Sequence, residues 1–170
     1  DLLDYRRSNY DSSLFLQGTN YIKYSIFDFF NFSYIRLYLM EKDLKQLNSD
    51  IIRVVINGPE STGKTTLTKQ LAEYFNTEYV PEFARDYLQE KWDLKKEVCS
   101  KEDLIVIVKE QVNLENKLSL KANKILLLDT NIITTINWSI THFDGYCDPW
   151  IIKQAEFLKY DHYLITNIDI

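Results

Sequence analysis

One stretch of the sequence combines residue types that bind phosphate, at a spacing that lets them act together. Residues 58–65 match the pattern G-x-x-x-x-G-K-[S/T] at every fixed position. The two glycines permit backbone angles that point successive amide N–H groups at phosphate oxygens. The lysine would reach the β and γ phosphates of a nucleoside triphosphate, and the last threonine hydroxyl would hold Mg²⁺. We therefore predict a site for ATP and Mg²⁺ that consists of Gly58, Glu60, Ser61, Thr62, Gly63, Lys64, Thr65 and Thr66.

The sequence on either side predicts the elements that must position this loop. Residues 51–56 are a short, β-branched apolar run, typical of a strand in the centre of a parallel sheet. After the loop, Leu67, Leu71 and Phe75 recur every four residues, which places them on one face of a helix. A helix that begins near Lys64 would direct the positive end of its dipole at the phosphates. The alternative is a glycine-containing turn before an ordinary helix.

A second pair of candidate residues follows the next predicted strand. Residues 77–80 form a short strand that Pro81 ends, and Glu82 then opens a helix with Arg85 on the same face. Ligands of open α/β sheets bind beyond the carboxyl ends of the strands. Glu82 could there accept the proton of a substrate hydroxyl as the γ-phosphate is transferred to it, and Arg85 could bind phosphate or substrate. The alternative is a helix-capping glutamate with a surface ion pair.

A third predicted strand ends in a carboxylate. Residues 124–128 are followed directly by Asp129. In enzymes with this kind of phosphate loop, an aspartate at the end of a strand holds Mg²⁺ or its water. We therefore predict that Thr65 and Asp129 form the metal site. The alternative is that Asp129 caps the next helix.

Three further side chains have two interpretations each. Gln111 is the polar member of an apolar helical stripe, so it is either hydrogen-bonded inside the protein or faces the substrate. Trp138 and Tyr146 could stack on a flat ring of the substrate or belong to the core. The other expected elements are a loop at 91–100 that contains Trp92, helices at 102–120, 132–142 and 150–160, a loop at 143–149 and a strand at 163–166.

Composition limits the class of protein. The chain has 170 residues, of which 45% are hydrophobic, enough for one globular domain with a core. The net charge of −5 and the lack of a basic stripe argue against a nucleic-acid partner. Cys99 and Cys147 have no metal-binding spacing and suit a reducing, cytoplasmic setting. The apolar stretch 21–40 contains three charged residues, so we expect no membrane span.

The first 39 residues differ in composition from the rest of the chain. They hold 11 of the 24 aromatic residues and contain no Glu, Ala or Pro. They also show no sustained helical or strand period. We therefore predict that residues 1–40 are an aromatic-rich extension, disordered or not native, and that residues 41–170 are the nucleotide-binding domain. The alternative is a small accessory element with one helix at 26–39.

Three motifs together resemble a known family. Residues 58–67, 81–87 and 129–135 are similar, in order and spacing, to the ribosylnicotinamide kinase domain of NadR-type proteins. This domain is a branch of the P-loop kinases that is often classified as an AAA-type ATPase, and the resemblance extends from about residue 51 to residue 170. It implies an α/β P-loop NTPase fold, a three-layer sandwich with a central, mainly parallel sheet. It also implies the phosphorylation of nicotinamide riboside by ATP to nicotinamide mononucleotide, a step of NAD salvage.

The resemblance carries over to individual residues. Lys64 and Thr65 correspond to ATP and Mg²⁺ ligands, Glu82 and Arg85 to residues on the substrate side, and Asp129 to the residue near the metal. We therefore predict Lys64, Glu82 and Arg85 as the catalytic residues.

The sequence departs from the family pattern at two places. Asn131 replaces the second acid of the family's Asp-Thr-Asp pattern. The sequence also reaches Ile170 before the arginine-bearing lid and fifth strand of such kinases, so we expect a C-terminally truncated domain. The alternative function is an ATPase or nucleotide-dependent switch that acts on a protein partner.

Overall fold

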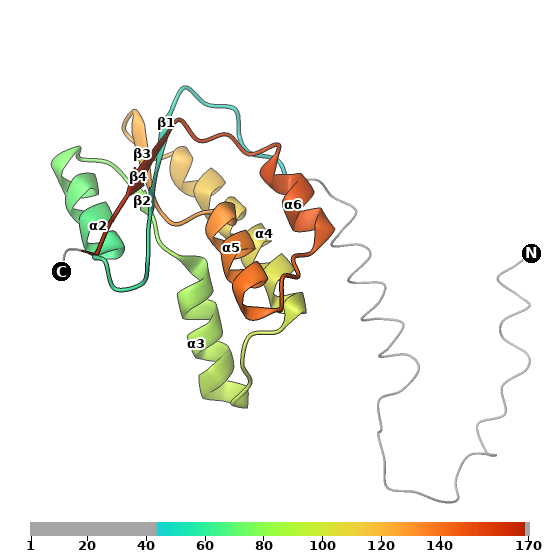
Figure 1. Cartoon of the computed structure of the whole chain (residues 1–170). Helices are drawn as coiled ribbons and strands as arrows, with labels where there is room; N and C mark the ends of the chain where they lie inside the picture. Colours follow the sequence, from blue (N-terminus) through green and yellow to red (C-terminus); the bar gives the residue numbers. More distant parts are fainter. Residues whose placement is uncertain (1–43, 169–170) are drawn as a thin grey trace, which may run out of the picture. The chain divides into compact units, whose positions relative to one another are not determined.

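Four parallel strands form the central sheet of the computed structural model, which describes residues 44–168 (Figure 1). They are β1 (Ile52–Asn57), β2 (Tyr79–Val80), β3 (Ile125–Asp129) and β4 (His162–Ile165). The strand order is β2-β3-β1-β4, and every pairing is parallel. The chain moves outward from β1 in one direction to form β2 and in the other to form β4. The carboxyl ends of β1 and β3 therefore flank the point where ligands of such sheets bind.

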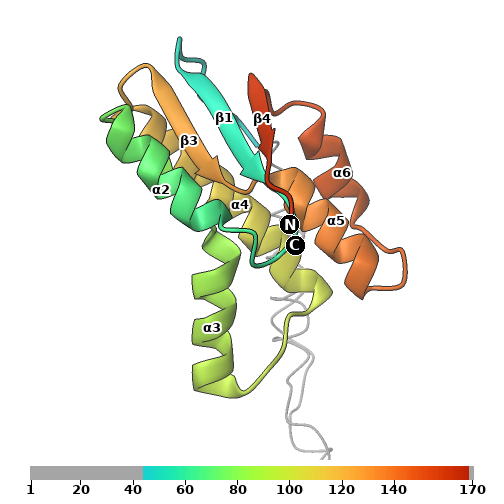
Figure 2. The same ribbon diagram turned by 60° about the vertical axis from the view of Figure 1, so that its left-hand side comes forward.

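The helices cover both faces of the sheet, as the predicted three-layer sandwich requires. In Figures 1 and 2, α2 lies on one face, whereas α4, α5 and α6 lie on the other. Helix α3 extends away from the carboxyl edge of the sheet (Figure 2). The helix bounds are α2 (Lys64–Tyr74), α3 (Phe83–Lys95), α4 (Lys101–Ser119), α5 (Ile132–His142) and α6 (Pro149–Ala155).

Two apolar clusters join the layers, because consecutive strand residues point to opposite faces. On the α4 face, Val55 and Leu128 are fully buried together with residues of β2 and β3. On the α2 face, Ile56 and Leu127 pack with Ala72. Both faces of the central strands are thus buried, which explains why the sequences of these strands are continuous apolar runs. The predicted strands at 51–56 and 124–128 are confirmed to within one residue.

Three sequence-based expectations about the helices were wrong. The predicted loop at 91–100 begins with the last turn of α3, which continues to Lys95 and ends where Lys96 adopts a left-handed backbone with φ of 57°. The segment has no Gly or Pro that would end the helix earlier. Its polar residues are therefore those of an exposed helical turn rather than of a loop. Helix α6 ends at Ala155, five residues early. Phe75 follows α2 and is 42% exposed.

The N-terminal part of the chain gives no test of the predicted domain division. The expectations for residues 1–40 lie outside the described residues. Within the described range 44–168, no helix combines the length and apolar character that a membrane span needs.

Candidate active site

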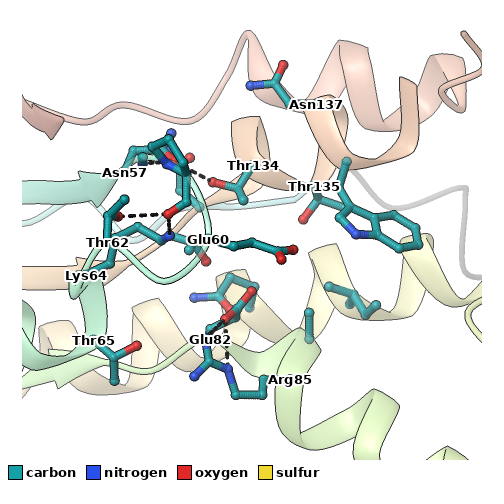
Figure 3. Close-up of a pocket in the computed structure, with 18 of the residues that line it drawn as sticks. Asn57, Glu60, Thr62, Lys64, Thr65, Glu82, Arg85, Thr134, Thr135 and Asn137 are labelled. Atoms are coloured by element: carbon teal, nitrogen blue, oxygen red, sulfur yellow. Dashed lines mark hydrogen bonds and ion pairs between the residues drawn. The ribbon is translucent and has the colours of Figure 1, made fainter. Parts of the chain in front are cut away.

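A cavity of about 1190 Å³ lies at the carboxyl edge of the sheet. It is lined by the phosphate loop and by residues of α3, α4 and α5. Figure 3 shows Lys64 and Glu60 of the loop, Glu82 immediately before α3, Arg85 of α3, and Thr134 of α5 around this space. The structure therefore brings together the loop and the residues that were predicted for the substrate side.

The loop holds backbone conformations that depend on its glycines. Gly58 has φ of 146° and Gly63 has φ of 80°, both in the region that side chains disfavour. A Cβ atom on Gly58 would clash with the hydroxyl and carbonyl oxygens of Thr166, which follows β4. The Thr166 hydroxyl also makes a 2.6 Å hydrogen bond with the hydroxyl of Thr62. The close approach of β4 thus fixes the path of the loop and explains the first glycine.

The N-terminus of α2 differs from those of three other helices. Side chains cap α4, α5 and α6, through Ser100, Asn131 and Asp148 respectively. In contrast, α2 begins after Gly63, and no side chain of residues 44–168 caps it. Its first amide N–H groups can therefore bind an anion, with the helix dipole adding to the attraction. The Lys64 ammonium donates a hydrogen bond to the Pro59 carbonyl oxygen (2.5 Å), across the same loop.

The two predicted metal ligands are in direct contact. The Thr65 hydroxyl donates a 2.6 Å hydrogen bond to Oδ2 of Asp129, which is 2% exposed. The other oxygen of Asp129, Oδ1, is buried and has no hydrogen-bond partner within the described part of the chain. Hydroxyl and carboxylate oxygens are the donors that Mg²⁺ prefers, and Mg²⁺ sites in phosphate loops use few protein ligands. These residues therefore fit Mg²⁺, with Thr65 nearer the cavity and Asp129 behind it.

Asp129 does not cap the following helix, so this alternative was wrong. Asn131 caps α5, because its side-chain oxygen accepts a hydrogen bond from the backbone N–H of Ile133 (3.2 Å). Between the two residues, Thr130 has φ of 77°, a rare conformation for a β-branched residue. This turn separates the Asp129 carboxylate from the Asn131 cap.

Glu82 and Arg85 form an ion pair at the start of α3. The Arg85 guanidinium donates two hydrogen bonds to Oε2 of Glu82 (2.8 and 3.2 Å). The hydrogen bond and the charge of Glu82, with a contribution from Asp129, raise the pKa of Arg85. Glu82 occupies the N-cap position, but its side chain makes no capping hydrogen bond to any described residue. The predicted surface pair is present, while the predicted cap is not.

Comparison with known proteins identifies the family. A family model described as an AAA domain matches residues 53–170. The chain belongs to this AAA domain family. No curated protein sequence matches it.

Two solved structures of NadR share the fold of the AAA domain. NadR in complex with NR has a TM-score of 0.56 and 25% identity, over 68% of this chain and 33% of that chain. NadR in complex with NAD and AMP-PNP has a TM-score of 0.56 and 23% identity, over 68% of this chain and 34% of that chain. The chain thus spans about one third of the length of these relatives. The P-loop NTPase fold and the resemblance to NadR-type kinase domains are confirmed.

Several residues that line the cavity of the AAA domain had no predicted role. The Asn57 side-chain oxygen accepts hydrogen bonds from the Gly58 N–H (2.9 Å) and from the Thr134 hydroxyl (3.3 Å). It thereby joins the loop to α5. The sequence could have indicated Asn57 as a site residue only by its position immediately before the loop. The Asn131 amide nitrogen also donates a hydrogen bond to the hydroxyl oxygen of Tyr163 (3.1 Å), whereas an ionised acid could only accept one there.

The residues with two interpretations are now placed. Gln111 is buried and bridges to α3, accepting from the Phe83 N–H (2.9 Å) and donating to the Pro81 carbonyl oxygen (3.3 Å). The interpretation as a buried, hydrogen-bonded residue is confirmed, and Gln111 also borders the cavity. Trp138 lines the cavity, whereas Tyr146 is not among the described lining residues. The Tyr146 ring instead lies under the Lys101 ammonium, 4.2 Å from it.

Proposed function

We propose that this AAA domain is an ATP-dependent kinase that converts nicotinamide riboside to nicotinamide mononucleotide, a step of NAD salvage. One observation carries the proposal: the phosphate loop and the carboxylate of Glu82 line the same cavity. Such an arrangement can hold a triphosphate and an acceptor hydroxyl at once. The fold shared with NadR, a structure of which contains NR, supports the riboside as the acceptor.

The phosphate loop would bind ATP. Its backbone amides and the N-terminus of α2 would contact the phosphates, and Lys64 would neutralise charge on the β and γ groups. Thr65 would coordinate Mg²⁺ and Asp129 would orient the Thr65 hydroxyl or a metal-bound water. Bound Mg²⁺ supplies charge neutralisation of the phosphate oxygens.

The transfer step uses Glu82 on the acceptor side. The acceptor hydroxyl oxygen forms a bond to the γ-phosphorus, and the bond between that phosphorus and the β–γ bridging oxygen breaks, releasing ADP. The hydroxyl proton goes to the Glu82 carboxylate. Arg85, paired with the same carboxylate, holds it towards the cavity.

The charges of the cavity favour an acceptor without a phosphate of its own. The Lys and Arg residues among its described lining are Lys64, in the loop, and Arg85, which Glu82 already pairs. A phosphorylated acceptor would place further negative charge beside Glu82 and Glu60 without a second free cation. Like charges brought together in this way oppose binding. A nucleoside therefore suits the cavity better than a nucleotide, and the cationic ring of nicotinamide riboside adds no negative charge.

The proposal is tested by incubating the purified protein with ATP, Mg²⁺ and nicotinamide riboside, and by following nicotinamide mononucleotide and ADP separately. Formation of both products in equal amounts supports the kinase. ADP formation at the same rate without riboside would overturn it and would indicate an ATPase or switch that acts on a protein partner. Lys64→Ala should lower turnover about a hundredfold or more, about 3 kcal/mol in the barrier.

A second variant separates binding from transfer. Glu82→Gln preserves the shape of the side chain but cannot accept the proton, so kcat for the riboside should fall while ATP binding stays near normal. ATP binding is measured by calorimetry, independently of turnover. Unchanged kcat in Glu82→Gln would show that another group accepts the proton.

A further inference from the structure

Apolar side chains from three helices line the same cavity as the phosphate loop. They are Ala84 and Leu88 of α3, Leu104 and Ile107 of α4, and Trp138 of α5. Trp138 follows Asn131 by seven residues, so it lies about 10 Å along α5 from the cap at the carboxyl edge of the sheet. The cavity therefore has a polar end at the loop and an apolar wall further along the helices.

Trp138 is the large aromatic side chain of this wall, and its ring is held by neighbours. The His142 ring stacks on it with centroids 4.1 Å apart and planes 12° from parallel. Phe143 meets it edge-on, with centroids 5.7 Å apart and planes 78° from parallel. The His142 Nδ1–H donates to the Trp138 carbonyl oxygen (2.9 Å), which fixes the imidazole against the indole. Trp138 is thus half-buried, and its ring is oriented by His142 in the same helix and by Phe143, which follows that helix.

We propose that Trp138 is the surface against which the flat ring of the phosphate acceptor lies, which makes it a specificity-determining residue. This inference rests on the proposed function, because it assigns the acceptor side of that same cavity. A nucleoside carries both features that the cavity would recognise: a sugar hydroxyl for Glu82 and a flat ring for Trp138. The π face of an indole attracts a cationic ring more strongly than a neutral one. Trp138 therefore favours nucleosides with a positively charged ring, such as a pyridinium.

Two variants at this position test the inference through steady-state kinetics. Trp138→Leu keeps an apolar side chain but removes the π face, so KM for nicotinamide riboside should rise about tenfold. KM for ATP should stay near the wild-type value, and Trp138→Phe should recover most of the affinity for the riboside. The matched control is Trp92→Leu, because Trp92 lies on α3, is 46% exposed and is not among the described residues that line the cavity. The control should leave both KM values unchanged.

A binding measurement provides a readout that does not depend on turnover. Nicotinamide riboside, added without ATP, should quench tryptophan fluorescence in the wild type and in Trp92→Leu, and the quenching should be lost in Trp138→Phe. An unchanged riboside KM in Trp138→Leu, or full quenching in Trp138→Phe, would overturn the inference while leaving the kinase intact. Conversely, quenching that depends on Trp138 in a protein that phosphorylates no nucleoside would support the ring site and reject the proposed function.

Discussion

Two buried aspartates, Asp129 at the end of β3 and Asp103 at the start of α4, have opposite surroundings. Asp103 accepts hydrogen bonds from the Tyr87 hydroxyl (2.8 Å), the Lys91 ammonium (2.6 Å) and the Ser100 backbone N–H (2.6 Å). Burial alone would raise the pKa of Asp103, but these bonds hold its pKa below the usual value. Asp129 accepts one hydroxyl, and its second oxygen has no partner in the described part of the protein.

The difference separates a carboxylate that holds the fold together from one that can hold a ligand. The hydrogen bonds of Asp103 come from the protein itself, and two of them, from Tyr87 and Lys91, come from α3. Helix α3 buries none of its described residues, so these bonds matter for the helix that carries Glu82 and Arg85. Asp129 instead keeps unused acceptor capacity beside the phosphate loop, at a cost in stability that a bound cation would offset.

The largest effect is expected from removing the charge of Asp129, the carboxylate that can hold a ligand. Asp129→Asn should lower turnover about a hundredfold or more, about 3 kcal/mol in the barrier, because the amide brings no charge to the metal. The free energy of unfolding should barely change, since the amide oxygen can still accept the Thr65 hydroxyl. Steady-state kinetics at saturating ATP and Mg²⁺, together with urea denaturation, measure the two quantities. Normal turnover in this variant would remove Asp129 from the metal site.

The second largest effect is expected from Asp103, the carboxylate that holds the fold together. Asp103→Asn should lower the free energy of unfolding by about 2 kcal/mol, because the Lys91 ammonium loses its 2.6 Å carboxylate partner and keeps the more exposed and more distant Glu97 (3.7 Å). Urea denaturation measures the change. The matched control is Asp93→Asn on the exposed side of α3, which should leave stability within about 0.5 kcal/mol. Equal stability of the two variants would show that Asp103 does not hold α3 in place.

A third buried carboxylate, Glu115, should make the stability of the folded protein depend on pH. Burial raises the pKa of Glu115 to about 8, although the Tyr160 hydroxyl and the charge of Arg53 act against the shift. The folded state therefore binds a proton that the unfolded chain releases near pH 4.5. The contribution of Glu115 to stability is therefore greatest below that pH and declines until the pH passes about 8.

The expected decline is about 1 kcal/mol between pH 6 and pH 7, because one proton per molecule is released on unfolding in this range. Glu115→Gln cannot titrate, so its stability should vary less over the same interval. Urea denaturation of both proteins at matched ionic strength gives the two slopes. Parallel slopes for variant and wild type would mean that Glu115 is ionised in the folded protein.

The smallest effect concerns the exposed pair on α3. The side chains of Arg85 and Glu82 are 62% and 24% exposed, so their ion pair is screened by water and should contribute about 0.5 kcal/mol to stability. Arg85→Ala should therefore unfold at nearly the wild-type urea concentration while it slows phosphate transfer. Arg85→Lys controls for charge, since it keeps the cation but not the two guanidinium hydrogen bonds to Oε2 of Glu82. A loss of stability as large as that of Asp103→Asn would assign Arg85 a structural role.

The parts of the fold that were predicted correctly have local signals. The strand, glycine loop and helix at 51–74 could be predicted because periodicity and the spacing of Gly and Lys lie within a few consecutive residues. The errors at the ends of α3 and α6 occurred where composition alone marked a boundary. Polar residues in the last turn of α3 resembled a loop, while burial of Leu158 after α6 draws the chain into the core. Neither boundary depends on a local stop residue.

The contacts that complete the candidate site join residues far apart in the chain. Asn57 and Thr134 are 77 positions apart, and Thr62 and Thr166 are 104 positions apart. No spacing rule reaches over such distances, so these pairs had no sequence signal. For Trp138 the sequence left two interpretations open, a substrate ring or the core, because its position in the cavity depends on how α5 packs beside α4.

The sequence by itself determined the prediction of a phosphate site, because the amides, ammonium and hydroxyl that would bind a triphosphate lie within eight consecutive residues. Only the tertiary structure decided what faces that loop. The parallel sheet brings the ends of β1 and β3 together, which seats Asp129 under Thr65. The packing of α3, α4 and α5 then places Glu82 and Trp138 on one cavity, since side chains from separate helices meet only when those helices pack around a common core.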